Sequence, residues 1–150
     1  LGILYLSASI KKYTNYTVSL YDTNINNIED IPYSDIYAFS TVTPTYSNCI
    51  DLARSIKKKY NDSKIIIGGV HASTNYNSID SIFDSIFIGQ SEDTIIEYIE
   101  DHTNNTIKYQ YFQTKKVDIN DLFPDRDLLT IDYIKTKSIF TFCSRTMSEY

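Results

Sequence analysis

Three short segments of this chain place glycine, hydroxyl or other polar residues directly after apolar, strand-like runs. They are residues 40–43, 68–71 and 89–92. The carboxyl ends of parallel strands lie along one edge of a sheet, and open α/β sheets bind their ligands at that edge. Hydroxyls, backbone N–H groups and glycines there can follow a large polar ligand or a phosphate group. The same residue types also form turns and cap helices, so a purely structural interpretation stays open.

The second of these segments is the most informative part of the chain. Residues 65–67 are three isoleucines, a run typical of a buried parallel strand, and Gly68 and Gly69 end it. Glycine has no Cβ, so another backbone or a flat ligand can come close at this point. A tight strand-to-helix turn would need the same glycines for its geometry alone, and both interpretations remain.

His71 and Glu92 are titratable residues within these segments. A histidine at a strand end can bind a metal, exchange protons or hydrogen-bond a ligand. His71 has no nearby histidine or cysteine at metal-ligand spacing, so we favour ligand contact and expect no metal site. Glu92 could act as an acid or a base, although carboxylates at a helix start are usually caps. Gly-x-Ser-x-Gly, phosphate-loop and Gly-x-Gly-x-x-Gly motifs are absent, and no catalytic residue is predicted.

The elements that must position these segments alternate between strands and helices. Alternation with short loops predicts an open, mostly parallel α/β sheet with helices on both faces. Residues 118–129 are acidic and contain a proline, which indicates a linker leaving the domain. The expected helices cover residues 1–12, 47–60, 78–83 and 94–101, and the expected strands cover residues 17–22, 35–40, 64–67, 85–88 and 108–112.

Composition limits the compartment and the partners. The chain has 150 residues, 42% of them hydrophobic and 14% aromatic, which suits one domain with a substantial core. Its formal net charge of -5 and the lack of a basic stripe argue against nucleic-acid binding. Cys49 and Cys143 are the only cysteines and make no disulfide framework, so a cytoplasmic location is expected. No apolar run is long enough to span a membrane, and no membrane partner is expected.

The order of the motifs resembles the cobalamin-binding domain of cobalamin-dependent radical SAM enzymes. Residues 66–72 resemble the Gly-Gly-x-His-Ala strand end of that family, and residues 37–46 resemble its third strand with the following loop. Residues 88–92 stand where the family often has Gly-Glu-Gly-Glu. Residues 1–6 resemble the opening of its first helix, and residues 122–129 resemble its linker into the catalytic barrel.

This resemblance implies a flavodoxin-like domain that holds cobalamin at the carboxyl ends of its strands, with the nucleotide tail entering the edge of the sheet. It implies a cobalamin-binding domain over residues 1–117, followed by a linker and the start of a truncated radical SAM region over residues 118–150. The parent would be a methyltransferase-like enzyme with a downstream radical SAM barrel, S-adenosylmethionine and a 4Fe-4S cluster. The implied cobalamin contacts are Ser40, Thr41, Thr43, Gly68, Gly69, His71, Gly89 and Glu92.

Departures from the family pattern limit what we expect of this chain alone. The first strand of the family would precede Leu1, and loss of that central strand is expected to weaken the sheet. Met147 and Tyr150 follow Cys143 at the spacings of the second and third cluster cysteines, so the 4Fe-4S cluster is not expected on this chain. The Asp-x-His-x-x-Gly motif that ligates cobalt in other cobalamin domains is absent, as in the radical SAM subgroup. We therefore expect a cobalamin-binding fragment that is not catalytic alone.

Two other classes of function remain as alternatives. A non-catalytic flavodoxin-like domain could serve only in interaction or regulation, although Asp22 alone does not supply the acidic cluster of a receiver domain. A flavin or nucleotide site is the other alternative, because the fold alone does not choose among these ligands.

Overall fold

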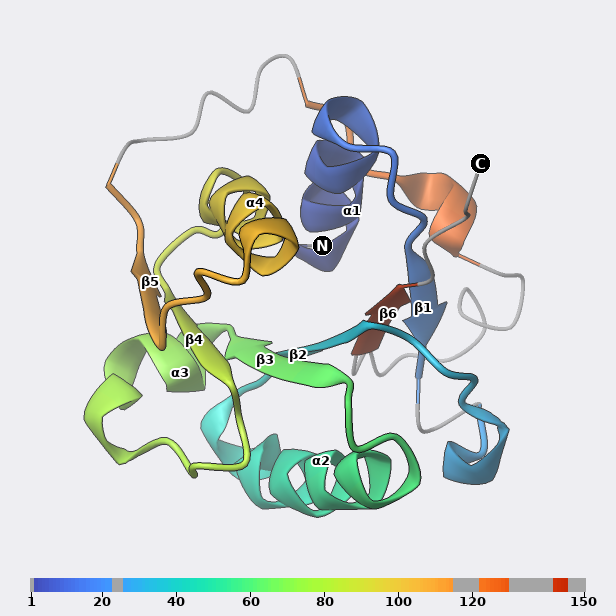
Figure 1. The fold of residues 1–150 in the computed structure, drawn as a ribbon, viewed down its shortest axis with the longest axis vertical. Helices are drawn as coiled ribbons and strands as arrows, with labels where there is room; N and C mark the ends of the chain where they lie inside the picture. Colours follow the sequence, from blue (N-terminus) through green and yellow to red (C-terminus); the bar gives the residue numbers. More distant parts are fainter. Residues whose placement is uncertain (1, 23–25, 115–121, 130–141, 146–150) are drawn as a thin grey trace.

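The computed structural model describes residues 2–22, 26–114, 122–129 and 142–145. Its centre is a six-stranded sheet in the order β1-β6-β2-β3-β4-β5 (Figure 1). Four neighbouring strands run parallel to one another: β2 (Ile36–Ser40), β3 (Lys64–Gly68), β4 (Ser85–Ile88) and β5 (Gln110–Phe112). The prediction of an α/β fold with a mostly parallel sheet is confirmed.

Helices cover both faces of the sheet because its strands alternate two sets of apolar side chains. Ile66 and Phe87 belong to the face covered by α1 (Gly2–Tyr13) and α4 (Thr94–Asn104). Ile65, Ile67 and Ile86 belong to the face covered by α2 (Tyr46–Lys59) and α3 (Val70–Thr74). In Figure 1, α1 and α4 lie above the sheet, and α2 and α3 lie below it.

The interior position between β1 (Ser19–Tyr21) and β2 is filled by β6 (Phe142–Arg145), which is antiparallel to both neighbours. In the flavodoxin-like strand order, this position belongs to the first strand. Here a segment from the far end of the chain occupies it, and the sheet is continuous from β1 to β5. The boundary at residue 117 between two regions of the chain stays a prediction.

Local structure departs from expectation at two helices. The expected helix over residues 78–83 is wrong, because the chain there leaves a short 3-10 turn and Asp80 Oδ1 accepts a hydrogen bond from Ile82 N. The short helix α3 was not expected. Short 3-10 helices, outside the main elements, cover Ile28–Asp30, Thr43–Thr45, Tyr76–Ser78 and Arg126–Leu128.

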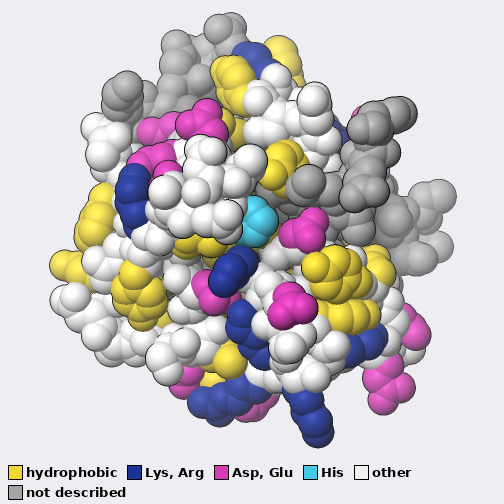
Figure 2. Space-filling model, in the orientation of Figure 1, with side chains coloured by type: hydrophobic (Ala, Val, Ile, Leu, Met, Phe, Trp, Pro, Cys, Tyr) yellow, Lys and Arg dark blue, Asp and Glu magenta, His cyan; other side chains and the backbone are white. Residues whose placement is uncertain are grey.

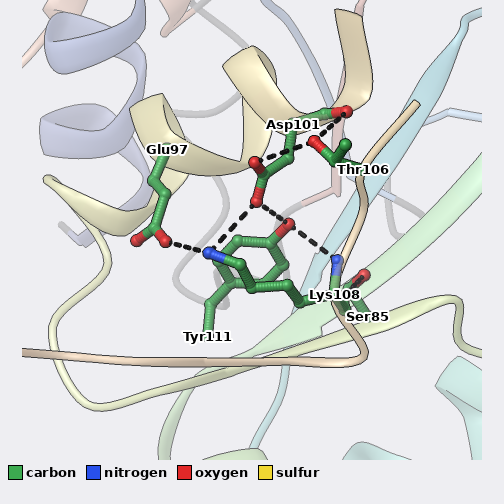
Figure 3. A network of polar contacts seen from close by, with 6 residues as sticks. All are labelled: Ser85, Glu97, Asp101, Thr106, Lys108 and Tyr111. Carbon is green, nitrogen blue, oxygen red and sulfur yellow. Dashed lines mark hydrogen bonds and ion pairs between the residues drawn. The ribbon is translucent and has the colours of Figure 1, made fainter. Parts of the chain in front are cut away.

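Ion pairs join helix α4 to the strands at the amino edge of the sheet (Figure 3). Lys108 Nζ lies 2.5 Å from Glu97 Oε1 and 3.4 Å from Asp101 Oδ2. Tyr111 OH donates to the same Asp101 oxygen at 2.8 Å. Burial acts to raise the pKa of Asp101, but the hydrogen bonds from Tyr111 and Thr106 and the charge of Lys108 outweigh it and hold that pKa below its ordinary value.

The surface is mixed in charge. On the face drawn in Figure 2, acidic and basic side chains lie interspersed and form no stripe of one sign. None of the described helices combines the length and the apolar character needed to cross a membrane.

Candidate functional site

The three polar segments meet at the carboxyl edge of the parallel strands. Ser40 pairs in register with Gly68 of the neighbouring strand, and Gly89 directly follows β4. Thr41 N donates to Gly68 O at 3.1 Å, and His71 N donates to Thr41 O at 3.2 Å. Gly89 N in turn donates to the hydroxyl of Ser73 in α3 at 3.0 Å. The loops after β2, β3 and β4 therefore form one connected rim.

A small pocket, partly open to solvent, lies at this rim, between the sheet and helices α1 and α4. Its walls are mostly apolar, as in many small-molecule sites. Three of the expected contact residues line it, Ser40, Gly68 and Gly69, whereas the other five lie outside its lining. The remaining lining residues are Ile3, Leu6, Ala38, Phe39, Ile66, Ile67, Phe87, Ser91 and Ile95.

The glycines of the rim are needed for different structural reasons. Gly69 has φ 93°, and a Cβ there would lie 2.7 Å from Thr41 O, so a neighbouring backbone demands this glycine. Gly89 has φ 92°, and a Cβ there would lie 2.8 Å from Gln113 Oε1. Both positions are explained by contacts within the protein, as the purely structural interpretation expects.

Gly68 is different, because space remains beside it. A Cβ at this position would make an ordinary 3.4 Å contact with Phe87 Cβ and would lie 4.0 Å from Ser91 Oγ. Phe87 and Ser91 both line the pocket, so a larger side chain at position 68 would project into it. Gly68 is therefore the glycine whose absence of a side chain keeps the pocket open.

His71 is held firmly at the other side of the rim. Its side chain is buried, its ring stacks on Tyr46 with centroids 4.1 Å apart, and its Nδ1 lies 3.1 Å from Thr43 Oγ1. Asn75 Nδ2 lies 3.5 Å from the same nitrogen. Tyr46 packs against the core on the α2 side, so His71 and Thr43 mark the rim over that face. Sequence analysis identified His71 but neither of its partners Tyr46 and Asn75.

Glu92 has one buried carboxylate oxygen, Oε2, without a hydrogen-bond partner among the described residues. The helix cap that sequence analysis considered for it is provided by Asp93, whose Oδ1 accepts a hydrogen bond from Thr94 N at 2.8 Å. The backbone carbonyl of Glu92 accepts a hydrogen bond from Ser9 Oγ at 2.5 Å and so connects this loop to α1. An unpaired buried carboxylate oxygen costs free energy, and a ligand that donates a hydrogen bond would recover it.

Part of the pocket wall was not predicted from the sequence. Ile3, Leu6 and Ser91 line the pocket, and none of them was among the expected contacts. Ala38 gave a usable signal, because it is a small residue among larger ones in β2 and its place in the strand alternation puts it on the α1 side. The contributions from α1 depend on how a helix packs across the sheet, and no local pattern carries that information.

Comparison with known proteins identifies the family. A family model described as the B12 binding domain matches residues 1–99. This chain belongs to the B12 binding domain family. Among solved structures, the N-terminal domain of a hypothetical protein of Thermotoga maritima is similar, with a TM-score of 0.49 and 17% identity over 62% of this chain and 77% of that chain. No curated protein matches the chain.

The residues of this B12 binding domain fit its cofactor. Cobalamin combines a broad corrin ring, which carries amide side chains, with a nucleotide tail that ends in a flat aromatic base. The apolar pocket beside Gly68 suits such a base, and the hydroxyls of Ser40 and Ser91 at its lining suit the polar part of the tail. The unpaired Glu92 Oε2 can accept from an amide N–H group. Family membership and local chemistry thus support the same cofactor.

Proposed function

We propose that this chain is the cobalamin-binding module of a radical SAM enzyme whose parent is methyltransferase-like. The observation that carries the proposal is the pocket beside Gly68 at the carboxyl edge, within the residues that the B12 binding family model matches. The motif order, including residues 122–129, favours the radical SAM subgroup. Bound cobalamin supplies a cobalt centre that carries a group between donor and acceptor. S-adenosylmethionine and the 4Fe-4S cluster of such a parent belong to its barrel.

The residues of this chain would bind and orient the cofactor. Ser40, Gly68 and Gly69 form the side of the pocket that takes the nucleotide tail. Thr41, Thr43 and His71 offer hydroxyl, backbone and imidazole groups to the corrin amides along the rim. Gly89 and Glu92 complete the contact set at the third loop, where the buried carboxylate oxygen is the strongest acceptor.

The test is retention of hydroxocobalamin by the purified chain during gel filtration, followed by its corrin absorbance. Wild-type protein at micromolar concentration is expected to carry the corrin, whereas Gly68→Val is expected to lose at least about tenfold in affinity because the new side chain enters the pocket. Gly2→Val is the matched control, because a Cβ at Gly2 meets nothing within 4 Å. Gly69 is unsuitable for this test, since a side chain there would disrupt the turn itself.

Thermal shifts with cobalamin, FMN and NAD separate the proposal from the flavin and nucleotide alternatives, because a ligand that binds the folded state raises the melting temperature. A shift with cobalamin alone supports the proposal. Folded wild-type protein that retains no corrin, or a Gly68→Val variant that binds as tightly as wild type, would contradict it. A shift with FMN or NAD alone would favour the corresponding alternative.

A further inference from the structure

Residues 122–129 are docked on helix α1, whose Ile3 and Leu6 line the pocket. Asp125 N donates to Leu4 O at 3.0 Å, which joins the two backbones. Leu122 is buried, and Leu128 packs against the core on the α1 and α4 side of the sheet. This segment is therefore held by apolar contacts near both ends and by a polar contact between them.

Asp125 is the polar centre of this contact. Ser7 Oγ donates to Asp125 Oδ2 at 2.5 Å, and Lys11 Nζ lies 2.6 Å from the same oxygen. Ser7 is fully buried, and the Asp125 side chain is only 8% exposed. Ser7 and Lys11 lie one helical turn apart, so both reach one carboxylate from the same side of α1. Burial acts to raise the pKa of Asp125, but its bonds with Lys11 and Ser7 outweigh this and hold the pKa below its ordinary value.

Polar contacts supplement the apolar packing of helix α1, part of which faces small pockets. Ile3 and Leu6 border the pocket, and Ile10 borders a second, smaller apolar pocket between the helix and the sheet. Side chains that face empty space lose dispersion contacts on that side. The bond from Ser9 Oγ to Glu92 O ties α1 to the loop after β4, and Asp125 ties it to the segment 122–129.

We propose that Asp125 is a latch for the cobalamin pocket, which fixes the pocket wall formed by Ile3 and Leu6 by holding segment 122–129 on α1. Asp125 does not line the pocket, so it is a positioning residue that acts through α1. The pocket as a cobalamin site rests on the proposed function, whereas the contact between Asp125 and α1 does not. A displacement of segment 122–129 would pass to the pocket wall through this carboxylate and through the bond from Asp125 N to Leu4 O.

Hydrogen exchange of the full chain tests the latch directly. In Asp125→Ala, we expect the amides of α1 to exchange about tenfold faster than in wild type, because local opening of the helix no longer breaks the bonds to Ser7 and Lys11. The amides of α2, on the opposite face, are expected to keep their rates. Asp125→Asn retains the shape but loses the charge, and should fall between wild type and Asp125→Ala. Asp127→Asn is the matched control, because that side chain is exposed on the same segment.

Ser7→Ala combined with Asp125→Ala provides a coupling test. Removal of the partner should accelerate α1 exchange little beyond the effect of Asp125→Ala alone, because the bond is already lost. Hydroxocobalamin affinity should fall several-fold in Asp125→Ala and stay unchanged in Asp127→Asn. Unchanged α1 exchange in Asp125→Ala, or acceleration spread equally over α1 and α2, would overturn the latch.

The latch and the proposed function fail in different ways. If wild-type protein retains no hydroxocobalamin, the function falls, and the exchange rates of α1 still decide whether Asp125 holds the helix. If wild type binds and α1 loosens in Asp125→Ala without any loss of affinity, the link between the latch and the pocket is overturned.

Discussion

The two edges of the parallel sheet use polar groups in opposite ways. At the amino edge, charged side chains are paired with one another, as in the contacts of Lys108 with Glu97 and Asp101 and of Lys57 with Asp84. At the carboxyl edge, the polar groups are mainly hydroxyls and backbone atoms, and the buried Glu92 Oε2 has no partner among the described residues. Both edges are built by the loops of the same four strands.

By this comparison, the amino edge stabilises the fold, whereas the carboxyl edge is suited to binding a ligand. At the amino edge, the charged side chains pair with one another and hold the helices onto the strands. Few of these charged groups are left to bind a ligand. At the carboxyl edge there remain an apolar pocket and a buried carboxylate oxygen without a partner among the described residues. Both features lower the stability of the folded protein unless a ligand fills the pocket and bonds to the oxygen. Variants at the two edges should therefore separate loss of folding from loss of cobalamin.

The largest effect is expected for Gly69→Ala. This glycine has φ 93°, and a new Cβ would lie within 2.8 Å of both Thr41 N and Thr41 O, which are backbone atoms of the adjoining loop. Backbone strain together with this overlap should cost about 3 kcal/mol or more in the free energy of unfolding, measured by urea denaturation. Gly2→Ala, with open space around the added methyl group, should stay close to wild type. A Gly69→Ala variant as stable as the control would show that the two loops do not meet as described.

Asp84→Ala should come next, and it should affect stability alone. Asp84 Oδ2 accepts hydrogen bonds from Ile65 N at 2.7 Å and from Lys57 Nζ at 3.0 Å. Its removal leaves both donors without this acceptor, for which we expect a loss of about 2 kcal/mol in urea denaturation. Asp62→Ala, at an exposed position near the same edge, is the control. Folded Asp84→Ala should retain hydroxocobalamin. Loss of the corrin from the folded variant would show that the amino edge also affects cofactor binding.

The parallel strands and most helices could be predicted from the sequence because their signals are local. The isoleucine run before Gly68 and the strand over residues 85–88 carry their own apolar pattern, and the structure has strands at both places. Because the loops are short, the strand ends were expected on one edge of the sheet. The structure brings residues 40–43 and 68–71 together there. Local pattern and chain connectivity were sufficient for this part of the fold.

The remaining features depend on contacts between distant parts of the chain. The bond from Ser7 to Asp125 joins positions 118 residues apart, and β6 pairs with β1 and β2 from the far end of the chain. Gln113 packs over Gly89 from the neighbouring strand end. In the sequence, however, Gly89 follows an apolar run just as Gly68 does. A glycine after a strand indicates that space is needed, but only the fold determines whether protein or ligand fills that space.

A pH series tests the paired charges of the amino edge. Because the pKa of Asp101 is below its ordinary value in the folded protein, its charge stabilises the fold above the unfolded pKa of about 4. This contribution is lost as the pH falls through the lower, folded-state pKa. Urea midpoints of Asp101→Asn should be lower than wild type at pH 6, and the two proteins should converge as the pH falls through the folded-state pKa of Asp101. Asp62→Asn should follow the wild-type profile, and an Asp101→Asn profile parallel to wild type would show that this pairing does not stabilise the fold.

Gln113→Ala should have the smallest effect and gives the sharpest information about the carboxyl edge. Gln113 Oε1 accepts from Gln90 N, and Gln113 Nε2 donates to Gln90 Oε1, both at 3.0 Å. Their loss at an exposed site should cost at most about 1 kcal/mol, and hydroxocobalamin retention should stay unchanged if the Gly89 loop keeps its place without these bonds. Gly89→Ala should be destabilised both by the overlap with Gln113 and by the positive φ. In the Gln113→Ala background, Gly89→Ala should therefore cost less stability, because the overlap with Gln113 Oε1 is removed while the strain of the positive φ remains. Loss of corrin from the folded Gln113→Ala variant would show that these bonds hold the Gly89 loop against the ligand, because Gln113 itself does not line the pocket.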